Sequence, residues 1–500
     1  MGIIVFINKH IISAINRIDS RLLIFLILCL NLLSFAVQSN EESYFALAKQ
    51  YMDTDWIPDS FVFSEWVGTR FLFQTIAGFA LKFLSFEQLA FWGRMVNFLC
   101  FAFPLALIFK ELKMKNIGIL FVFQLFMFNM NTQHFFGDEW IFRGFESKTM
   151  AYIFVFYALY YLLKNKYGRV ALFAAFASYF HILVGGWFFV LAFVYVLINE
   201  RNVKISLKTG FIYLGVVFPF IVYLGLYLNN DGSVINGVDI DWVYSFFRNP
   251  HHTAPMHRIR AMQSVLPRVA ASFMLLLASI FYFRKHPDEN IRKLNLVATI
   301  SLCMIFIGLI ITYIDVNGRI LKYYLFRISA IGAFCYFLLL FLFLRDKLQK
   351  RFNSNHLQVI LFIFILPFFL IGTVKNISRQ IEYSKKEKDL KELVAFVCDN
   401  TNPDDIYLFL DKDEDTFSRR TRRDAFVVFK FVPGGGEKIY EWYIRVQERK
   451  KLQEDIAYID TIKEKYRLDY LIARKEIKHS HLKKRYHDNK YYLYEVVQSE

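Results

Sequence analysis

The chain of 500 residues is 56% hydrophobic, contains 57 Phe and carries a formal net charge of +16. No ordinary soluble protein of this length needs so much apolar sequence, so the composition excludes that class. The charge would suit a nucleic-acid-binding protein, but the Lys and Arg residues gather in short segments between long apolar runs, where membrane proteins place them. The sequence therefore predicts a polytopic α-helical membrane protein that does not bind nucleic acid.

Eleven apolar runs are candidates for transmembrane helices, because a helix needs about 20 residues to cross a bilayer. They are 22–38, 91–109, 117–131, 149–163, 170–182, 184–198, 209–228, 264–283, 294–314, 322–344 and 357–374. The first run has no small-residue cleavage site, so we expect it to remain as a signal anchor. The runs 170–182 and 184–198 are short, and a tight hairpin that crosses only partly is the alternative to two spans.

The segment 67–84 is either a twelfth span or an amphipathic helix on the outer surface of the membrane. Arg70, Gln74 and Lys82 interrupt its apolar pattern. A further span here would also place the basic segment 110–115 on the outer side. We therefore favour the surface helix.

Five basic segments set the expected orientation of the chain. They are 110–115, 164–169, 201–208, 284–293 and 345–351. With eleven spans, all five fall on the same side as the N-terminus, and the positive-inside rule makes that side cytoplasmic. The stretch after the last span is then extracytoplasmic.

The composition changes near residue 375, where charged sequence replaces apolar sequence. Short strand-like runs at 405–410, 425–429 and 468–473 alternate there with helical stretches at 385–400 and 450–466. This alternation predicts a small α/β domain. We expect a transmembrane domain over 1–374 and a soluble domain over 375–500.

The first outer loop, 39–90, begins with two acids, Glu41 and Glu42, and continues with Asp53 and Asp55. A carboxylate at the edge of a low-dielectric region has a raised pKa, which suits a general base. The alternative is a solvated helix end at the membrane boundary. These four acids are the candidates for catalysis.

The second outer loop, 132–148, places acids and bases close together. They are Asp138, Glu139, Arg143, Glu146 and Lys148. The acids suit a divalent metal or a sugar hydroxyl, and the alternative is that opposite charges pair and hold the loop. The chain has no HExxH or CxxC spacing, so no metal site is assigned.

Cations and histidines near the outer face suit a phosphate or pyrophosphate head group. They are Arg248, His251 and His252 in the outer loop 229–263, and Arg319 and Lys322 beside the tenth span. The alternatives are a surface loop with incidental histidines and interfacial anchors that extend toward the head groups. In the C-terminal stretch, Arg-rich loops suit an anionic ligand, and the alternative is that they form a solvated basic surface.

Four local patterns are similar to those of one enzyme superfamily. They are Glu41-Glu42, Gly144 to Lys148 ahead of a span, Arg248 to His252, and a tail with Phe417, Arg423, Lys430, Pro433, Glu441, Trp442 and Arg445. With its many spans and terminal soluble domain, the chain resembles the GT-C superfamily of integral-membrane glycosyltransferases. Within it, the patterns look like those of uncharacterised bacterial proteins.

The resemblance implies glycosyl transfer at the outer face of a bacterial plasma membrane, from a polyprenyl-phosphate sugar to a glycan, lipid or protein. Glu41 or Glu42 would orient or deprotonate the acceptor hydroxyl. Many members of the superfamily use Asp here, so Asp53 and Asp55 stay candidates. The donor phosphate would meet Arg248, His251, His252, Arg319 or Lys322.

The C-terminal domain would bind the acceptor, and its Trp442 and Arg445 are candidate contacts together with the second outer loop. The resemblance implies no particular cofactor, and it leaves open whether the reaction uses a divalent metal. Polysaccharide polymerases and ligases are an alternative, although they usually keep their catalytic groups in a large late loop. A transporter or flippase is another alternative, but such proteins tend to carry charges within the membrane and inverted repeats. This sequence has few charges within its predicted spans, and we see no internal repeat in it.

Overall fold

The computed structural model describes residues 6–63, 68–129, 133–227, 233–257, 259–412 and 414–497. Parts of the three predicted outer loops, at 64–67, 132, 229–232 and 258, lie outside these residues. Contacts divide the chain into two compact units. Unit 1 comprises Met1–Ser34, Phe91–Tyr223 and Ser245–Ser378, and unit 2 comprises Phe35–Ala90, Leu224–Tyr244 and Arg379–Glu500.

The described chain is mainly helical, and 7 of its helices are long and apolar enough to cross a membrane. They are α6 (Phe86–Glu111), α11 (Ile182–Glu200), α12 (Val203–Tyr227), α15 (Ile259–Phe281), α16 (Glu289–Ile314), α17 (Ser329–Gln349) and α18 (Ser354–Asn400). Length and composition are thus consistent with the helical membrane protein that the sequence predicts.

The other four predicted spans are also helical but shorter. They are α3 (Ser20–Leu32), α7 (Asn116–Phe128), α9 (Ser147–Leu163) and α10 (Tyr167–Phe180), with 13, 13, 17 and 14 residues. Helices α10 and α11 meet at His181, which ends one helix and begins the next, and they pack on each other. Because a straight span needs about 20 residues, the count of eleven spans stays a prediction.

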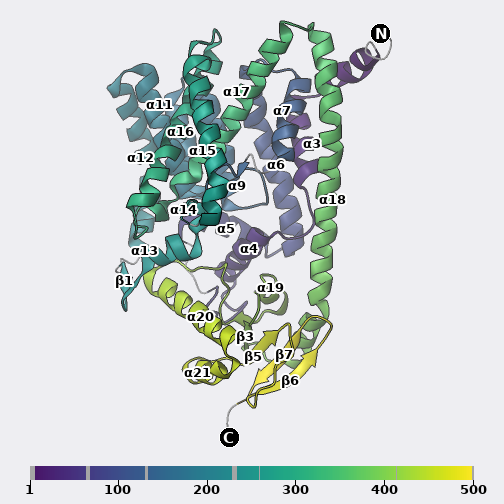
Figure 1. Cartoon of the computed structure of the whole chain (residues 1–500), viewed down its shortest axis with the longest axis vertical. Helices are drawn as coiled ribbons and strands as arrows, with labels where there is room; N and C mark the ends of the chain where they lie inside the picture. The colour runs from purple at the N-terminus through teal and green to yellow at the C-terminus, as the bar shows by residue number, and fades with distance from the viewer. Residues whose placement is uncertain are drawn as a thin grey trace. The chain divides into compact units, whose positions relative to one another are not determined.

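The loop between α7 and α9 is inserted into the helical core of unit 1. The ring of Phe142 in this loop lies 4.9 Å from Phe101 of α6, 5.4 Å from Phe123 of α7 and 5.8 Å from Phe156 of α9. Helix α16 packs on α11, α15 and α17, and these helices stand side by side in Figure 1. The aromatic packing holds the loop against the bundle and positions the polar residues that follow Phe142.

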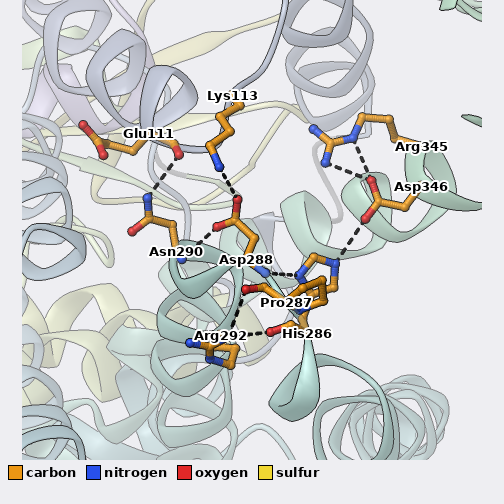
Figure 2. Close-up of polar contacts among 9 residues, drawn as sticks. All are labelled: Glu111, Lys113, His286, Pro287, Asp288, Asn290, Arg292, Arg345 and Asp346. Atoms are coloured by element: carbon orange, nitrogen blue, oxygen red, sulfur yellow. Dashed lines mark hydrogen bonds and ion pairs between the residues drawn. The ribbon is translucent and has the colours of Figure 1, made fainter.

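Polar contacts join several helix ends that carry basic segments (Figure 2). Lys113 after α6 pairs with Asp288 before α16 at 2.8 Å, and the amide of Asn290 donates to the backbone oxygen of Glu111 at 3.2 Å. At the end of α17, the Asp346 carboxylate lies 3.2 Å from His286 Nε2. Three of the five basic segments therefore meet at one end of unit 1.

Further contacts bring the remaining two segments to the same end. Lys164 pairs with Glu111 at 3.3 Å, and Lys293 donates to the backbone oxygen of Leu163 at 2.9 Å. The hydroxyl of Tyr167 bonds to Glu200, which directly precedes the segment 201–208. Exposed ion pairs of this kind contribute only about 0–1 kcal/mol each, so their main significance is positional.

Unit 2 contains a five-stranded mixed sheet in the order β4-β3-β5-β7-β6. The strands are β3 (Ile406–Phe409), β4 (Asp424–Ala425), β5 (Tyr470–Ala473), β6 (Leu482–His487) and β7 (Tyr492–Val496). Strand β3 pairs in parallel with β4 and β5, whereas β7 is antiparallel to β5 and β6. The helices α19 (Phe417–Thr421), α20 (Gly436–Glu454) and α21 (Ile459–Lys465) lie between the strands in the chain.

The first-loop segment packs into unit 2. Helix α4 (Ser39–Met52) and the residues after it contribute Trp56, Val62 and Phe63 to a buried cluster that also contains Val428 and Phe431. Helix α5 (Phe71–Ala80), within the segment 67–84, packs on α4. Contacts therefore group the first outer loop with the C-terminal stretch.

Two expectations for the C-terminal stretch need correction. The strand expected over 425–429 ends at Ala425. The N–H of Phe426 still donates to the oxygen of Tyr407 in β3 at 2.8 Å, but Val428 accepts a hydrogen bond from the side chain of Trp442 instead of pairing with a strand. The helix expected over 450–466 is interrupted at Asp455, whose side chain accepts from the N–H of Ala457 and starts a new turn. Helix α18 runs without a break through residue 375, for about 70 Å at 1.5 Å per residue.

Candidate functional site

A buried charged cluster, the Glu139 cluster, lies in unit 1 and consists of Glu139, Lys148, His252 and Arg327. The loop that carries Glu139 is held by Gln133, whose side-chain oxygen accepts from the N–H groups of Ile141 and Phe142 at 3.0 Å each. Gly137 has a positive φ of 64°. A Cβ there would lie 2.7 Å from the Cβ of Phe326 and 3.0 Å from the oxygen of His252, so only glycine fits this turn.

The carboxylate of Glu139 is fully buried and receives both cations of the cluster. Its Oε2 lies 2.7 Å from Arg327 NH1 and 3.3 Å from Lys148 Nζ. Its Oε1 lies 3.6 Å from His252 Nδ1 and accepts no hydrogen bond from the described residues. The Nε of Arg327 is likewise buried without a hydrogen-bond partner there. A buried ion pair persists only when its charges compensate each other, so each member depends on the others.

His252 is fixed in one tautomer. Its Nδ1 lies 2.6 Å from the carbonyl oxygen of Gly137, and because a carbonyl only accepts, Nδ1 carries the proton. Burial removes the ring from water and lowers the pKa of His252 to about 3, although the negative charge of Glu139 opposes this shift. Burial alone would raise the pKa of Glu139, but the charges of Arg327 and Lys148 lower it to about 2. At neutral pH the cluster thus holds an ionised Glu139 and a neutral His252.

Aromatic rings cover the two cations of the cluster. Lys148 Nζ lies 3.7 Å from the centre of the Trp140 ring, and the guanidinium carbon of Arg327 lies 4.6 Å from the Tyr324 ring. Such cation–π contacts stabilise by about 0.5–2 kcal/mol when water is excluded. Arg143 lies over the same Trp140 ring at 5.4 Å. The aromatic rings therefore fix the cations in place, rather than leaving them mobile.

An apolar cavity of about 160 Å³ lies between α15, α16 and α17 in unit 1. Its lining includes Phe135, Leu275, Leu302, Ile305, Tyr336 and Phe337. Arg268 lies seven residues, or two helical turns, before Leu275 on α15. Its NH1 donates to the backbone oxygens of His134 and Phe135 at 3.0 and 3.2 Å, so it lies beside the cavity wall. Arg268 makes no ion pair and no other side-chain hydrogen bond with the described residues.

A second charged group, the Glu42 cluster, lies in unit 2 and consists of the buried side chains of Glu42 and Arg419 and the half-exposed side chain of Glu87. Arg419 Nε lies 2.7 Å from Glu42 Oε2, and its NH2 lies 3.0 Å from Oε1. Its NH1 lies 2.6 Å from Glu87. Burial raises the pKa of Glu42 to about 7, although the charge of Arg419 opposes this shift. Arg419 NH2 also lies 4.0 Å from Glu387 Oε1, so this arginine pairs with three acids. With a pKa of about 7, Glu42 titrates near neutral pH.

The other first-loop acids have different positions. Glu41 is buried, and its Oε2 accepts from the N–H of Gln38 at 2.8 Å, which caps the start of α4. Asp53 ends α4 and pairs with Lys49 at 2.9 Å. Asp55 is exposed. Of the four candidate acids, Glu42 is the one whose two carboxylate oxygens both contact Arg419.

The candidate phosphate ligands are spread over two loops of unit 1. Arg248 donates to the side chain of Asn249 at 3.2 Å, and the ring of His251 lies 4.1 Å from that of His252. Arg319 is exposed, and Lys322 is half-buried beside the Tyr323 ring. Of these residues, His252 alone is part of the Glu139 cluster.

The other candidate residues from the sequence lie at the surface, cap a helix or support the packing of unit 2. Asp138 is exposed, and Glu146 is buried at the N-cap of α9, where it forms a capping box with Thr149. Trp442 is buried and donates to the oxygen of Val428 at 3.1 Å. Arg445 pairs with Glu441 at 2.6 Å and lies 3.9 Å from the Phe61 ring, so its guanidinium supports the packing of unit 2.

Sequence reasoning missed Arg327, Arg268 and Glu87, and it considered Arg419 only within the Arg-rich loops of the C-terminal stretch. Arg327 stands within the predicted span 322–344 and Arg268 within 264–283. A cation inside an apolar run is itself a signal of function, and this signal could have identified both residues. Glu87 and Arg419 are far apart in the chain, so their pairing could not be read from it.

These features define a helical membrane protein with buried charged clusters and an apolar cavity among its long helices. Residues 388–449 match a family model described as a domain of unknown function, DUF6798. The match extends from the end of α18 into α20 and includes Arg419, Trp442 and Arg445. No curated protein matches the chain.

Proposed function

We propose that the chain is a GT-C-like glycosyltransferase that moves a sugar from a polyprenyl-phosphate donor to a glycan, lipid or protein acceptor at the outer face of a bacterial plasma membrane. The supporting observation is the apolar cavity with Arg268 beside its wall. A polyprenyl-phosphate needs an apolar site for its tail and a cation for its phosphate. In unit 1, helix α15 contributes Leu275 to the lining of the apolar cavity and also carries the cation, Arg268.

Arg268 is the preferred phosphate ligand for a geometric reason. Two backbone carbonyls hold its NH1, which orients the guanidinium, whereas Nε and NH2 have no partner among the described residues. A phosphate can accept from these two nitrogens as a bidentate pair. Arg319 and Lys322 are further candidates from the sequence, and their test is the same.

Glu42 is the preferred acid among the four first-loop candidates. Its pKa of about 7 allows it to accept a proton from a hydroxyl near neutral pH, as a general base requires. In this structure Arg419 contacts both of its oxygens. Under the proposal, the acceptor hydroxyl replaces one of these contacts during the reaction.

The topology belongs to the same proposal. Eleven spans with a cytoplasmic N-terminus place all five basic segments inside and residues 375–500 outside. The polar contacts that collect these segments at one end of unit 1 support this arrangement. A tag at residue 500 should be reached by membrane-impermeant reagents in intact cells, and access from the cytoplasm alone would refute the topology.

Photocrosslinking to a polyprenyl phosphate that carries a diazirine in its tail tests the donor site. We expect labelled peptides from α15 to α17, and about 10-fold weaker labelling of Arg268→Gln, since a charged hydrogen bond contributes about 1.5–3 kcal/mol. Arg284→Gln, an exposed arginine beyond the other end of α15, is the matched control and should label like the wild type. Equal labelling of wild type and Arg268→Gln would remove Arg268 from the site.

Activity is tested by comparing surface glycans and lipid-linked sugars by mass spectrometry in cells with and without the protein. We expect a lipid-linked sugar to accumulate and one glycan to lose a residue when the protein is absent. Unchanged glycans and lipid-linked sugars would contradict the proposed transfer. A change in a whole repeat unit, rather than in one sugar, would favour a polymerase or ligase instead.

A further inference from the structure

Three side chains with metal-binding atoms converge in unit 2, away from the residues used above. Asp460 lies in the first turn of α21, and His479 and His481 lie just before β6. Their ligand atoms all lie within 4.8 Å of one another. We propose that Asp460, His479 and His481 bind a divalent transition-metal ion, with Zn²⁺ as the preferred occupant.

The distances fit an ion after small side-chain rotations. His481 Nδ1 lies 2.5 Å from Asp460 Oδ1, and His479 Nε2 lies 4.0 Å from Oδ2. Zinc binds nitrogen and oxygen ligands at about 2.0–2.2 Å, which separates neighbouring ligand atoms by roughly 3.3 Å in a tetrahedral site. The separation between His481 and Asp460 therefore has to lengthen, and the separation between His479 and Asp460 has to shorten, each by less than about 1 Å.

The ligand set selects the class of metal. Two imidazoles and one carboxylate suit Zn²⁺ and its neighbours in the first transition row, whereas Mg²⁺ and Ca²⁺ prefer oxygen ligands. The side chains of Asp460, His479 and His481 are 43%, 14% and 28% exposed, so an ion can enter from solvent. Three protein ligands also leave one position of a tetrahedral zinc site open to water.

A hydrogen bond between His481 and Asp460 is the simpler explanation of one contact. It does not explain why His479 directs its Nε2 toward the other oxygen of the same carboxylate, with its ring centre 5.7 Å from that of His481. His479 Nδ1 accepts a hydrogen bond from the N–H of His481 at 3.3 Å. Binding through Nε2 moves the ring proton to Nδ1 and breaks this long hydrogen bond, which adds to the rearrangement that the ion must offset.

The ion would join helix α21 to the segment just before strand β6. Strand β6 is the edge strand, next to β7, and α21 precedes β5 in the chain. Bridging α21 and the start of β6 would stabilise the edge of the sheet, because an ion that binds only the folded state adds its binding free energy to stability. This role is independent of glycosyl transfer.

Metal titration of the full chain in detergent, after chelator treatment and removal of any histidine tag, tests the site. We expect one equivalent of Zn²⁺ by calorimetry, one equivalent of Co²⁺ with a d–d absorption band, and a higher unfolding temperature with Zn²⁺. The variant His479→Ala with His481→Ala should lose all three effects. His487→Ala removes an exposed histidine at the end of the same strand and should keep them.

A further variant separates ligation from folding. Asp460→Asn can still hydrogen-bond His481 but offers a poorer ligand, so we expect at least about 10-fold weaker binding with an unchanged circular dichroism spectrum. Absence of stoichiometric binding to the wild type would overturn the proposal. So would equal binding by the wild type and the double histidine variant, which would mean adventitious metal at other sites.

Discussion

Arg419 holds both carboxylate oxygens of Glu42, with contacts of 2.7 and 3.0 Å, although the two residues lie 377 positions apart. The pair joins α4 to α19 within unit 2. Because Glu42 is buried, the arginine compensates a charge that would otherwise be very costly. The pair therefore ties α4 to α19, while burial raises the pKa of Glu42 to about 7 against the opposing charge of Arg419.

The first prediction concerns the arginine. Arg419→Lys retains a positive charge but cannot bind two oxygens of Glu42 and one of Glu87 in the same planar geometry. We expect a loss of about 2–4 kcal/mol, because the buried Glu42 loses its bidentate partner. Thermal unfolding in detergent measures the loss. Arg422→Lys, at an exposed neighbouring arginine, should leave the unfolding temperature unchanged.

The second prediction concerns pH and Glu42. Its pKa rises from 4.5 to about 7 on folding, so between these values the folded chain binds more protons than the unfolded chain. This group therefore lowers stability as pH rises from about 4.5 to 7. In Glu42→Gln that contribution disappears, and the variant should lose less stability than the wild type over this range. Parallel stability curves for the two proteins would contradict the raised pKa.

The third prediction concerns Glu139. Glu139→Gln leaves Arg327 and Lys148 buried beside a neutral amide, and we expect a loss of about 3–5 kcal/mol. Asp138→Asn is the control, because Asp138 is exposed and its removal should change stability by less than about 0.5 kcal/mol. The comparison is made by thermal or denaturant unfolding in the same detergent. Equal stability of the two variants would mean that Glu139 is not paired with Arg327 and Lys148 in the folded protein.

The fourth prediction concerns His252 in acid. Its pKa falls from 6.5 to about 3 on folding, so the unfolded chain takes up the proton first as pH falls below 6.5. The stability that His252 contributes is complete above about pH 6.5 and is lost as pH falls toward 3. His252→Asn should lose less stability than the wild type between pH 7 and 5. The exposed His356 serves as the control, since His356→Asn should follow the wild type.

The fifth prediction concerns Gly137. An alanine there has a strained positive φ and meets the Cβ of Phe326 and the oxygen of His252. Gly237 also has a positive φ, of 80°, but a Cβ there meets nothing within 4 Å. Gly137→Ala should therefore cost more than Gly237→Ala, about 2–4 kcal/mol against about 1 kcal/mol. Similar unfolding temperatures for the two variants would exclude the close contact.

The sequence predicted the helices well because their signal is local. Each of the eleven apolar runs overlaps a helix in the described chain, since a long apolar run without Gly or Pro clusters has few other ways to satisfy its backbone. The break at Asp455 and the short strand β4 were missed because they depend on side-chain bonds to Ala457 and Val428. Such bonds are not visible as a periodic pattern.

By itself, the sequence determined a helical, basic, apolar chain and the polar residues between its long helices, because composition and periodicity are properties of neighbouring residues. Only the tertiary structure decided how those polar residues combine. It buried Glu42 against Arg419 and Glu139 against Arg327, and it used Glu41 and Glu146 as helix caps. The reason is that burial and ion pairing depend on distances in space, which residues far apart in the chain acquire only on folding.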